Sequence, residues 1–369
     1  MKTVLLASGG SGGHLAPAIA LAQRLRSEGL RTIVSTTRKG VDRRLQVRYP
    51  DLEFVVMSPA RKGEGVRAKV EFAVEMAAAV WWSAVFLNRT GTDLVFATGG
   101  FGCAPVATAA CLLGVPLQIH ESNSVPGRLS SLFRPASAMT WITRLFGDSS
   151  GWRQSRRVVE TGVPLRAEFK CRDMSEAKAD LGLDPLRPVV TVFGGSQGAR
   201  SLNNWASTGT SHLRALGVQI ICVSGPSGIL EPVPDDIRII DFCDDMPGLY
   251  SASDMIIARS GSGTLSELAA FRVPSVLVPY PFAAADHQLE NAKRFACAGC
   301  GVLLDENELD RAEVLIGHFL CDPDWMQACR ENLGRWDAGS SVAGLVQELA
   351  RPDRGCGDLV EPGRRMPTG

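Results

Sequence analysis

The stretch Leu6-Ala7-Ser8-Gly9-Gly10-Ser11-Gly12-Gly13-His14 decides the fold of this chain. It closes an apolar run over residues 4–7 and opens a helical pattern over residues 15–22. A buried strand that turns through glycines into a helix can bind an anion, because glycine lets the backbone approach and the first helical N–H groups point at the ligand. The stretch therefore predicts a phosphate-binding loop. A tight strand-to-helix turn without a ligand is the alternative.

The same pattern recurs three times along the chain. Apolar runs at 94–98, 189–193 and 255–259 lead into the glycine-rich segments 99–102, 194–200 and 260–264. In doubly wound α/β domains, loops at the carboxyl ends of parallel strands line the ligand crevice. Because two such loops fall in each half of the chain, we expect two Rossmann-like α/β domains that face each other across a cleft.

Apolar runs alternate with helical patterns along the whole chain, which indicates parallel sheets. Predicted strands cover residues 2–7, 31–36, 53–57, 93–97, 116–119, 138–142 and 157–160 in the first half, and 188–193, 218–223, 236–240, 255–258, 275–278 and 301–304 in the second. We predict a first domain over residues 1–165, a second over 166–339, a final helix over 340–350 and a disordered tail over 351–369.

The 39 Lys and Arg residues balance the 39 Asp and Glu residues, but the two halves differ in charge. Residues 1–166 carry 21 Lys and Arg against 11 Asp and Glu, and residues 167–369 carry 18 against 28. A basic half attracts an anionic surface or substrate, and a solvated basic surface is the alternative. No nucleic-acid-binding motif accompanies these charges, so nucleic acid is not an expected partner. The ten scattered cysteines, with no secretory pattern before the first strand, predict a reducing cytosol.

A strongly apolar segment, residues 72–87, contains Trp81 and Trp82 and lies between Lys69 and Arg89. It is shorter than a transmembrane helix usually is. Two interpretations fit the segment. It forms a helix of the hydrophobic core, or it lays one face in a membrane interface, where paired tryptophans beside Lys and Arg are favoured.

A nicotinamide dinucleotide site does not fit the first glycine loop. Its fingerprint needs a glycine where Leu15 stands, and an acidic residue at the end of the second strand, where the chain has Arg38. A nucleotide-sugar site fits better, because Glu267 follows the loop 260–263 within one helical turn and can accept both ribose hydroxyls. A capping box from Thr264 to Glu267 is a second interpretation of the same spacing.

Other polar groups complete the nucleotide-sugar pattern. Residues 286–291 supply amide and imidazole groups suited to sugar hydroxyls. Arg166 and Ser196 offer hydrogen-bond donors for a pyrophosphate.

With these motifs the chain resembles the MurG family of bacterial glycosyltransferases, which add N-acetylglucosamine to lipid I. The resemblance rests on residues 9–14, 99–101, 120–123, 162–166, 194–200, 244–246, 259–261 with 266–267, and 286–288 with Asn291, in order over residues 1–350. Val163 stands where the family usually has Asn. Cys243 stands where an aliphatic residue often precedes the Asp pair, which matters little because a backbone contact to uracil is implied there.

The resemblance implies a GT-B fold whose final helix crosses back onto the first domain. It implies an inverting transfer from UDP-N-acetylglucosamine to the 4-hydroxyl of N-acetylmuramic acid in lipid I, which gives lipid II and needs a general base. His14 is the candidate base, and a structural histidine that caps the loop is the alternative. The implied substrate-binding residues are Ser11, Gly12, Gly13, Asn123, Arg166, Ser196, Cys243, Ser262, Gly263, Thr264, Leu265, Ser266, Glu267 and Gln288.

The resemblance implies no cofactor and no metal, since helix dipoles and basic side chains replace the metal in such folds. It implies peripheral attachment to an anionic membrane at the cytoplasmic face of the plasma membrane, with cell-wall synthesis and division proteins as candidate partners. Two other functions stay open. A transferase for another lipid acceptor, such as a diacylglycerol glucosyltransferase, would lack the motif at residues 120–123. A non-catalytic lipid-binding subunit would not need both phosphate loops together with Glu267 and His14.

Overall fold

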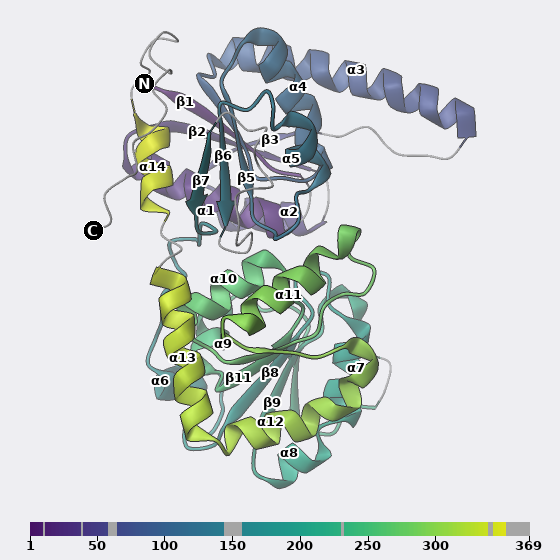
Figure 1. Ribbon diagram of the computed structural model, residues 1–369, viewed down its shortest axis with the longest axis vertical. Helices are drawn as coiled ribbons and strands as arrows, with labels where there is room; N and C mark the ends of the chain where they lie inside the picture. Colours follow the sequence, from purple (N-terminus) through teal and green to yellow (C-terminus); the bar gives the residue numbers. More distant parts are fainter. Residues whose placement is uncertain are drawn as a thin grey trace.

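The computed structural model describes residues 1–9, 12–37, 40–57, 65–143, 157–229, 232–338 and 342–351. These residues form two α/β domains that lie one above the other in Figure 1, each with a parallel sheet and helices on its faces. The predicted α/β class is confirmed, and every predicted strand is present within two residues of its expected ends.

The first domain is built on a seven-stranded parallel sheet with the order β3-β2-β1-β4-β5-β6-β7. Its strands are β1 Thr3–Ala7, β2 Arg31–Thr36, β3 Glu53–Val56, β4 Leu94–Ala97, β5 Leu117–Glu121, β6 Met139–Thr143 and β7 Val158–Thr161. Its helices are α1 Gly12–Ser27, α2 Gly40–Arg48, α3 Gly65–Thr90, α4 Ala104–Leu113 and α5 Arg128–Phe133, with the 3-10 helix η1 Phe101–Cys103.

The second domain is built on a six-stranded parallel sheet with the order β10-β9-β8-β11-β12-β13. Its strands are β8 Val189–Phe193, β9 Gln219–Val223, β10 Ile237–Ile240, β11 Met255–Ala258, β12 Ser275–Leu277 and β13 Val302–Leu303. Its helices are α6 Met174–Asp180, α7 Arg200–Thr208, α8 Ser211–Ala215, α9 Met246–Ala252, α10 Ser262–Phe271, α11 His287–Cys297, α12 Ala312–Leu320 and α13 Pro323–Ala338, with the 3-10 helices η4 Gly225–Ser227, η5 Ala284–Asp286 and η6 Glu306–Arg311.

Both sheets reverse their strand order beside their first strand, between β1 and β4 and between β8 and β11. Ligands of doubly wound sheets bind in the crevice at this reversal. The four glycine-rich loops that the sequence singles out follow these four strands. The topology therefore brings each pair of loops to the reversal point of its own sheet.

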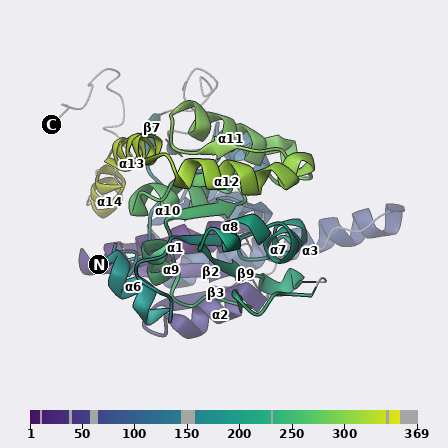
Figure 2. The same ribbon diagram turned by 90° about the horizontal axis from the view of Figure 1, so that it is seen from below.

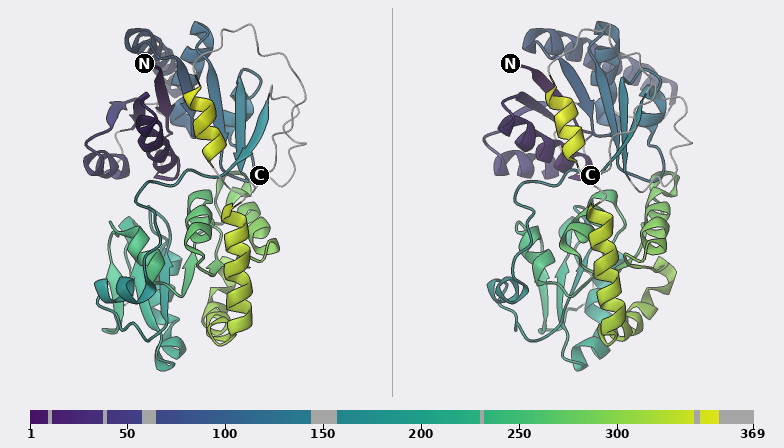
Figure 3. Two further views of the ribbon diagram at one scale, coloured as in Figure 1. Left: turned by 90° about the vertical axis from the view of Figure 1, so that its left-hand side faces the viewer. Right: turned by 60° about the vertical axis from the view of Figure 1, so that its left-hand side comes forward.

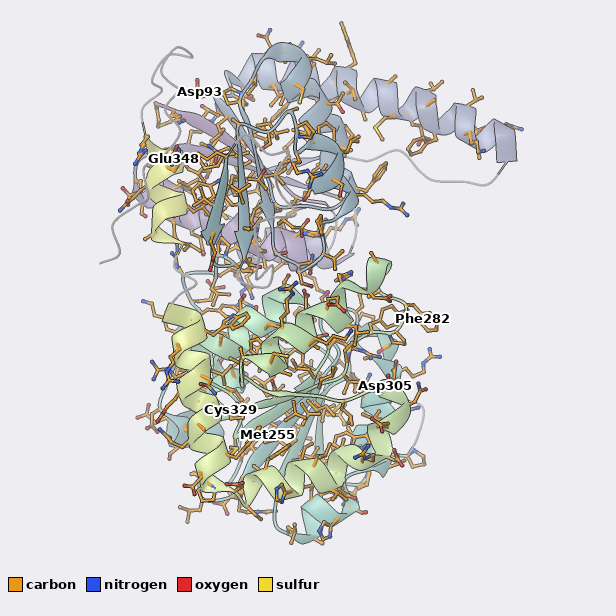
Figure 4. The ribbon with its side chains drawn as sticks, in the orientation of Figure 1. Asp93, Met255, Phe282, Asp305, Cys329 and Glu348 are labelled. Carbon is orange, nitrogen blue, oxygen red and sulfur yellow. The ribbon has the colours of Figure 1, made fainter. Side chains whose placement is uncertain are left out.

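The final helix, α14 Ala343–Ala350, leaves the second domain and packs on the first (Figure 3). Leu345 and Leu349 are fully buried in a cluster with residues of β1 and α1. Glu348, labelled in Figure 4, lies on this helix 3.9 Å from the guanidinium of Arg157 beside β7. The chain therefore connects the two domains twice. Of the predicted tail, all but Arg351 lies outside the described residues.

Helix α3 is longer than the apolar segment 72–87 and projects from the first domain (Figures 1 and 2). Trp81 and Trp82 are 73% and 45% exposed, whereas Ser83 and Leu87 are buried. The core-helix interpretation is therefore wrong for most of the segment. Among the described residues, the stretch Arg67–Thr90 is long and apolar enough to cross a membrane by length and composition, and 11% of its most apolar 18-residue window is buried.

Candidate active site

His14 lies in the first turn of α1, and two glycines of the loop after β4 pack against its ring. A Cβ on Gly99 would lie 2.9 Å from His14 Cε1, and a Cβ on Gly100 would lie 3.0 Å from His14 Cδ2. Both glycines have a positive φ, 106° and 83°, which other residues rarely adopt. The backbones of Gly9 and Gly100 approach each other even more closely, since a Cβ on Gly9 would lie 2.4 Å from Gly100 Cα. The two glycine loops of the first domain thus interlock and place the imidazole.

The hydrogen bonds of His14 define which ring nitrogen carries the proton. Nδ1 lies 2.9 Å from the carbonyl oxygen of Thr98, which can only accept, so Nδ1 is the donor of a neutral ring. Nε2 then keeps its lone pair, and among the described residues it has no hydrogen-bond partner. Burial lowers the pKa of His14, and the carboxylate of Glu121 opposes this shift. A neutral imidazole with a free Nε2 is the form that a general base needs.

The first turn of α10 is open toward a ligand. Gly261 is its N-cap, and no side chain of the described residues accepts a hydrogen bond from the first-turn N–H groups. A Cβ on Gly263, or on Gly13 in the first turn of α1, would meet nothing within 4 Å. The helices α1 and α10 contact each other across the two domains. Two helix N-termini, each able to bind an anion, therefore lie near the domain interface.

Glu267 is held by a tyrosine from another element rather than by a helix cap. Its Oε2 accepts a hydrogen bond of 2.7 Å from the hydroxyl of Tyr250, a buried residue of α9. The predicted capping box is wrong, because α10 begins at Ser262 and Thr264 lies inside the helix. Burial raises the pKa of Glu267, while Tyr250 and the charge of Arg166 lower it. No motif of the sequence points to Tyr250.

Arg166 follows β7 in the segment that joins the two domains. Its guanidinium donates to the hydroxyl of Tyr49 at 3.1 Å and lies 3.8 Å from the carboxylate of Glu168. It also stacks on the ring of Phe169, 4.4 Å from the ring centre. The positive charge of Arg166 lowers the pKa of Glu267, the residue of the predicted ribose site.

Two of the predicted binding residues form contacts between the domains. Ser262 Oγ donates to Ser122 Oγ at 3.0 Å. Asn123 Oδ1 accepts a hydrogen bond of 3.2 Å from Nδ2 of Asn291 in α11. The sequence placed Asn291 in a motif but did not assign it as a site residue. Gln288, in the first turn of the same helix, uses its side-chain oxygen to accept from the backbone N–H of Tyr280 at 2.9 Å.

The remaining predicted residues differ in what they can offer a ligand. Ser196 is exposed in the loop after β8, and Gly12, Thr264 and Ser266 are half-buried. The side chain of Leu265 is buried in the core, and its backbone N–H donates to the carbonyl of Gly261. Cys243 is half-buried, and burial raises its pKa to about 11. Ser11 lies outside the described residues.

The acidic pair after Cys243 has structural contacts. Asp245 caps α9 at the N–H of Gly248 and binds the guanidinium of Arg172 at 2.7 Å. Asp244 lies 3.9 Å from Arg48 of α2. Within the described ranges, no group of three or more His, Cys, Asp or Glu side chains is placed to hold a metal ion.

Family models match both halves of the chain. Residues 4–138 match the N-terminal domain of glycosyltransferase family 28, and residues 189–317 match the C-terminal domain of the same family. The first match contains the glycine-rich loops after β1 and β4, and the second contains those after β8 and β11.

Full-length relatives carry one common description, UDP-N-acetylglucosamine--N-acetylmuramyl-(pentapeptide) pyrophosphoryl-undecaprenol N-acetylglucosamine transferase. The protein of Opitutus terrae is 34% identical over 98% of this chain and 98% of its own length. The protein of Chlorobium luteolum is 33% identical over 94% of this chain and 99% of its own length.

Solved structures share the two-domain arrangement. The crystal structure of Acinetobacter baumannii MurG has a TM-score of 0.68 at 23% identity, and covers 94% of this chain and 100% of that one. The calicheamicin glycosyltransferase CalG4 has a TM-score of 0.65 at 17% identity, with 95% and 97% covered. At these identities the likeness concerns the fold, and it confirms the expected GT-B arrangement.

Proposed function

The chain belongs to glycosyltransferase family 28, and we propose that it transfers N-acetylglucosamine from UDP-N-acetylglucosamine to lipid I, which gives lipid II. The relatives described as transferases for this donor and this undecaprenyl-pyrophosphoryl acceptor match nearly the whole chain, not one domain alone. One structural observation carries the proposal. An uncapped helix N-terminus, with open space at Gly263, is followed one turn later by a carboxylate that Tyr250 holds in place.

The second domain, residues 166–339, is the donor domain in this proposal. The donor pyrophosphate binds the first-turn N–H groups of α10, and the ribose hydroxyls bind the other carboxylate oxygen of Glu267, Oε1. The uracil lies against the backbone at Cys243, and Gln288 faces the sugar. Arg166 and Ser196 supply further donors to the phosphates. Ser196, which follows β8, and the N-terminus of α10, which follows β11, lie at the reversal point of the second sheet, and this supports the assignment of the donor phosphates.

The first domain, residues 1–165, binds the acceptor with its pyrophosphate near Gly12 and Gly13. His14 Nε2 takes the proton of the acceptor 4-hydroxyl while that oxygen attacks C1 of the donor sugar. The bond between C1 and the UDP oxygen breaks with its electron pair on UDP, so the configuration at C1 inverts. The positive end of the α10 dipole stabilises the charge that develops on the departing diphosphate.

The test is UDP release from UDP-N-acetylglucosamine with three acceptor conditions: a short-chain lipid I analogue, diacylglycerol and none. We expect release with the analogue and a product heavier by one N-acetylhexosamine. Release with diacylglycerol instead would favour the transferase for another lipid. No release from the folded protein with either acceptor would favour the non-catalytic subunit. In the matched variant Gly263→Ala we expect normal folding and weaker donor binding, because its Cβ meets only the space that the pyrophosphate takes.

For the place of this reaction, we propose peripheral attachment to the cytoplasmic leaflet through α3 and α4. Val70, Val74, Trp81 and Trp82 are exposed on α3, and Leu112 and Leu113 are exposed on α4, which packs against α3. Exposed apolar groups of this size favour an interface with lipid or protein. Arg67, Lys69 and Arg89 flank them on α3 and attract anionic headgroups by about 1 kcal/mol each.

Sedimentation of the full chain with anionic and with neutral vesicles tests this attachment. Binding should prefer anionic vesicles and should weaken with salt without vanishing, because salt screens charge but not apolar burial. Trp81→Ala combined with Trp82→Ala should reduce binding. The control replaces Leu186 and Val314 by Ala, since both are exposed apolar residues of the second domain. Equal losses in the two double variants, or no preference for anionic lipid, would contradict the proposal.

A further inference from the structure

We propose that the end of helix α2, in the first domain, is part of the donor site, and that Arg44, Arg48 and Tyr49 are positioning residues for the nucleotide-binding groups of the second domain. The inference rests on the proposed function, because it adds residues to the donor site described above. It concerns contacts that cross the domain interface, so they exist only while the two domains face each other as they do in this structure.

Helix α2 lies on the side of the first domain that faces the second domain (Figure 1). Its sequence, Gly40 to Arg48, contains three arginines and one acidic residue. The facing loop of the second domain, residues 241–245, leads from β10 to α9 and contains three aspartates. A basic helix and an acidic loop therefore meet at the domain interface, and this charge complementarity favours their contact.

The two ends of this loop are fixed by the second domain itself. At its start, the side chain and the carbonyl of Asp241 accept hydrogen bonds from the loop after β9, at 3.3 Å and 3.0 Å. At its end, Asp245 binds the guanidinium of Arg172 and caps α9. The middle of the loop, residues 242–244, contains Cys243, where the proposed backbone contact to uracil lies.

The middle of the loop is held by the first domain. The guanidinium of Arg44 lies over the ring of Phe242, with 4.7 Å between Cζ and the ring centre, so a cation packs on the aromatic face. Arg48 donates a hydrogen bond to the carbonyl of Asp244 and lies 3.9 Å from its carboxylate. These two contacts fall on the residues directly before and after Cys243. They therefore hold the backbone of the proposed uracil contact from both sides.

Tyr49, the residue after α2, contacts the phosphate side of the same site. Its hydroxyl accepts a hydrogen bond of 3.1 Å from the guanidinium of Arg166 and donates to the carboxylate of Glu168. Since the ring of Phe169 also packs on this guanidinium, the direction of the Arg166 side chain is fixed from two sides. Arg166 is a proposed donor to the phosphates. The contacts of α2 and Tyr49 thus reach both the uracil end and the phosphate end of the donor site.

These contacts should act on donor affinity rather than on the chemical step. A binding loop that is already held in one conformation loses less conformational entropy when the ligand binds, so removing the contacts weakens binding. Neither the proposed base His14 nor the N-terminus of α10 takes part in them. Because the contacts cross the interface, donor binding should in turn favour this arrangement of the domains to the same degree.

The experiment compares Arg44→Ala, Arg48→Ala and the double variant with the natural chain. It measures the Kd of UDP by calorimetry, and KM and kcat with UDP-N-acetylglucosamine and a short-chain lipid I analogue. A cation over an aromatic ring or an ion pair at an exposed position contributes about two- to fivefold in affinity. We therefore expect the double variant to raise the UDP Kd and the donor KM by about five- to tenfold, with kcat within about twofold.

The matched control is Arg43→Ala, which removes the same charge from an exposed position of the same helix and should keep the natural Kd. Arg44→Lys should retain most of the affinity, because an ammonium group also packs over an aromatic ring. Tyr49→Phe keeps the ring but removes the hydroxyl that contacts Arg166, and should raise the UDP Kd by about two- to fivefold.

An unchanged UDP Kd in the double variant would overturn the inference. An equal rise in Arg43→Ala would overturn it as well, because only the overall charge of α2 would then attract UDP. In the free protein, the amides of residues 242–244 should exchange at least threefold faster in the double variant than in Arg43→Ala, while β8 keeps its protection, and equal exchange would contradict the proposal. If the natural chain binds UDP but leaves lipid I unchanged, the proposed function fails, and the UDP Kd of the variants still decides the inference. A natural chain that binds no UDP would overturn both.

Discussion

At the scale of single residues, the glycines of the active site fall into two groups. Gly9, Gly99 and Gly100 are in close contact with one another or with His14, and a Cβ there would collide with backbone or with the imidazole. Gly13 and Gly263 border open space. The same glycine-rich pattern predicts both groups. The sequence alone does not distinguish a glycine that is needed for packing from a glycine that leaves space for a ligand. The structure separates them by what surrounds each Cβ position.

The sequence could not predict how the site residues are held. Glu267 fits a capping box by spacing, yet its partner is Tyr250, seventeen positions earlier and on another helix. Asn291 and Asn123 are 168 positions apart. Contacts between distant positions depend on the packing of whole elements, which local patterns do not contain. The residue types at each loop were predictable, and their partners were not.

Replacing His14 tests the assignment of the base. His14→Ala should lower kcat by about 100-fold or more while UDP binds nearly as before, since a general base acts on the chemical step. In the natural chain, the acid limb of the kcat profile should lie below pH 6.5, because burial lowers the pKa of this ring. Rates from pH 5 to 8 check both points. Normal turnover in the variant, or an acid limb above pH 6.5, would contradict the assignment of His14 as the base and would indicate a structural role.

Replacing the two partners of the ribose site tests the donor assignment. Glu267→Ala should weaken donor binding far more than acceptor binding, since hydrogen bonds to a charged group contribute roughly 1.5–3 kcal/mol each. Tyr250→Phe keeps the ring stacked on Phe271 but removes one bond to the carboxylate, and should raise the donor Kd by about tenfold. Calorimetry with UDP measures the donor Kd of both variants. An unchanged Kd in Glu267→Ala would remove this carboxylate from the site.

At the scale of elements, the strand–glycine–helix units were predictable because each unit is formed by about fifteen consecutive residues. All four fall at the reversal points of the two sheets, where ligand sites form. Helix α3 was not predictable in the same way. Its apolar composition fits a buried helix and an exposed helix equally. The helix is exposed because little of the rest of the protein packs against it.

Helix α14 provides a prediction at this scale. Leu345 and Leu349 complete a core that otherwise consists of first-domain residues, so the end of the chain stabilises its beginning. Leu345→Ala should lower the unfolding free energy of the first domain by about 2–5 kcal/mol. Hydrogen exchange should accelerate in α1 and β1, with little change in β8 and β9. Gln347→Ala, exposed on the same helix, serves as control. Equal acceleration in both sheets would mean that the domains unfold together.

At the scale of the whole molecule, the charge division of the sequence follows the two domains. The basic half carries α3 and its exposed tryptophans, and the acidic half carries the proposed donor site. The described contacts between the domains are largely polar: Ser122 with Ser262, Asn123 with Asn291, and Ala167 N with the side chain of Gln23. A polar interface permits domain motion more readily than an apolar one.

His120 lies beside the segment that joins the two domains, and it makes the stability of the fold depend on pH. It is buried at the end of β5, and its Nε2–H donates to the carbonyl of Gly162, where the connection between the domains begins. Its Nδ1 has no partner within the described part of the chain. Burial, together with the nearby His14, lowers the pKa of His120 from 6.5 to about 4.

Since the unfolded chain binds this proton more readily than the folded one, the stabilisation is complete above pH 6.5 and is lost as the pH falls toward 4. At pH 4 the loss from His120 alone is about 3 kcal/mol. His120→Gln retains a donor for Gly162 and removes the titration. Urea unfolding at pH 7 and pH 4.5 should therefore show a loss of stability about 2–3 kcal/mol larger in the natural chain than in the variant. Other titrating groups act alike in both proteins and cancel in this comparison, so equal losses would mean that His120 takes up its proton without cost in the folded state.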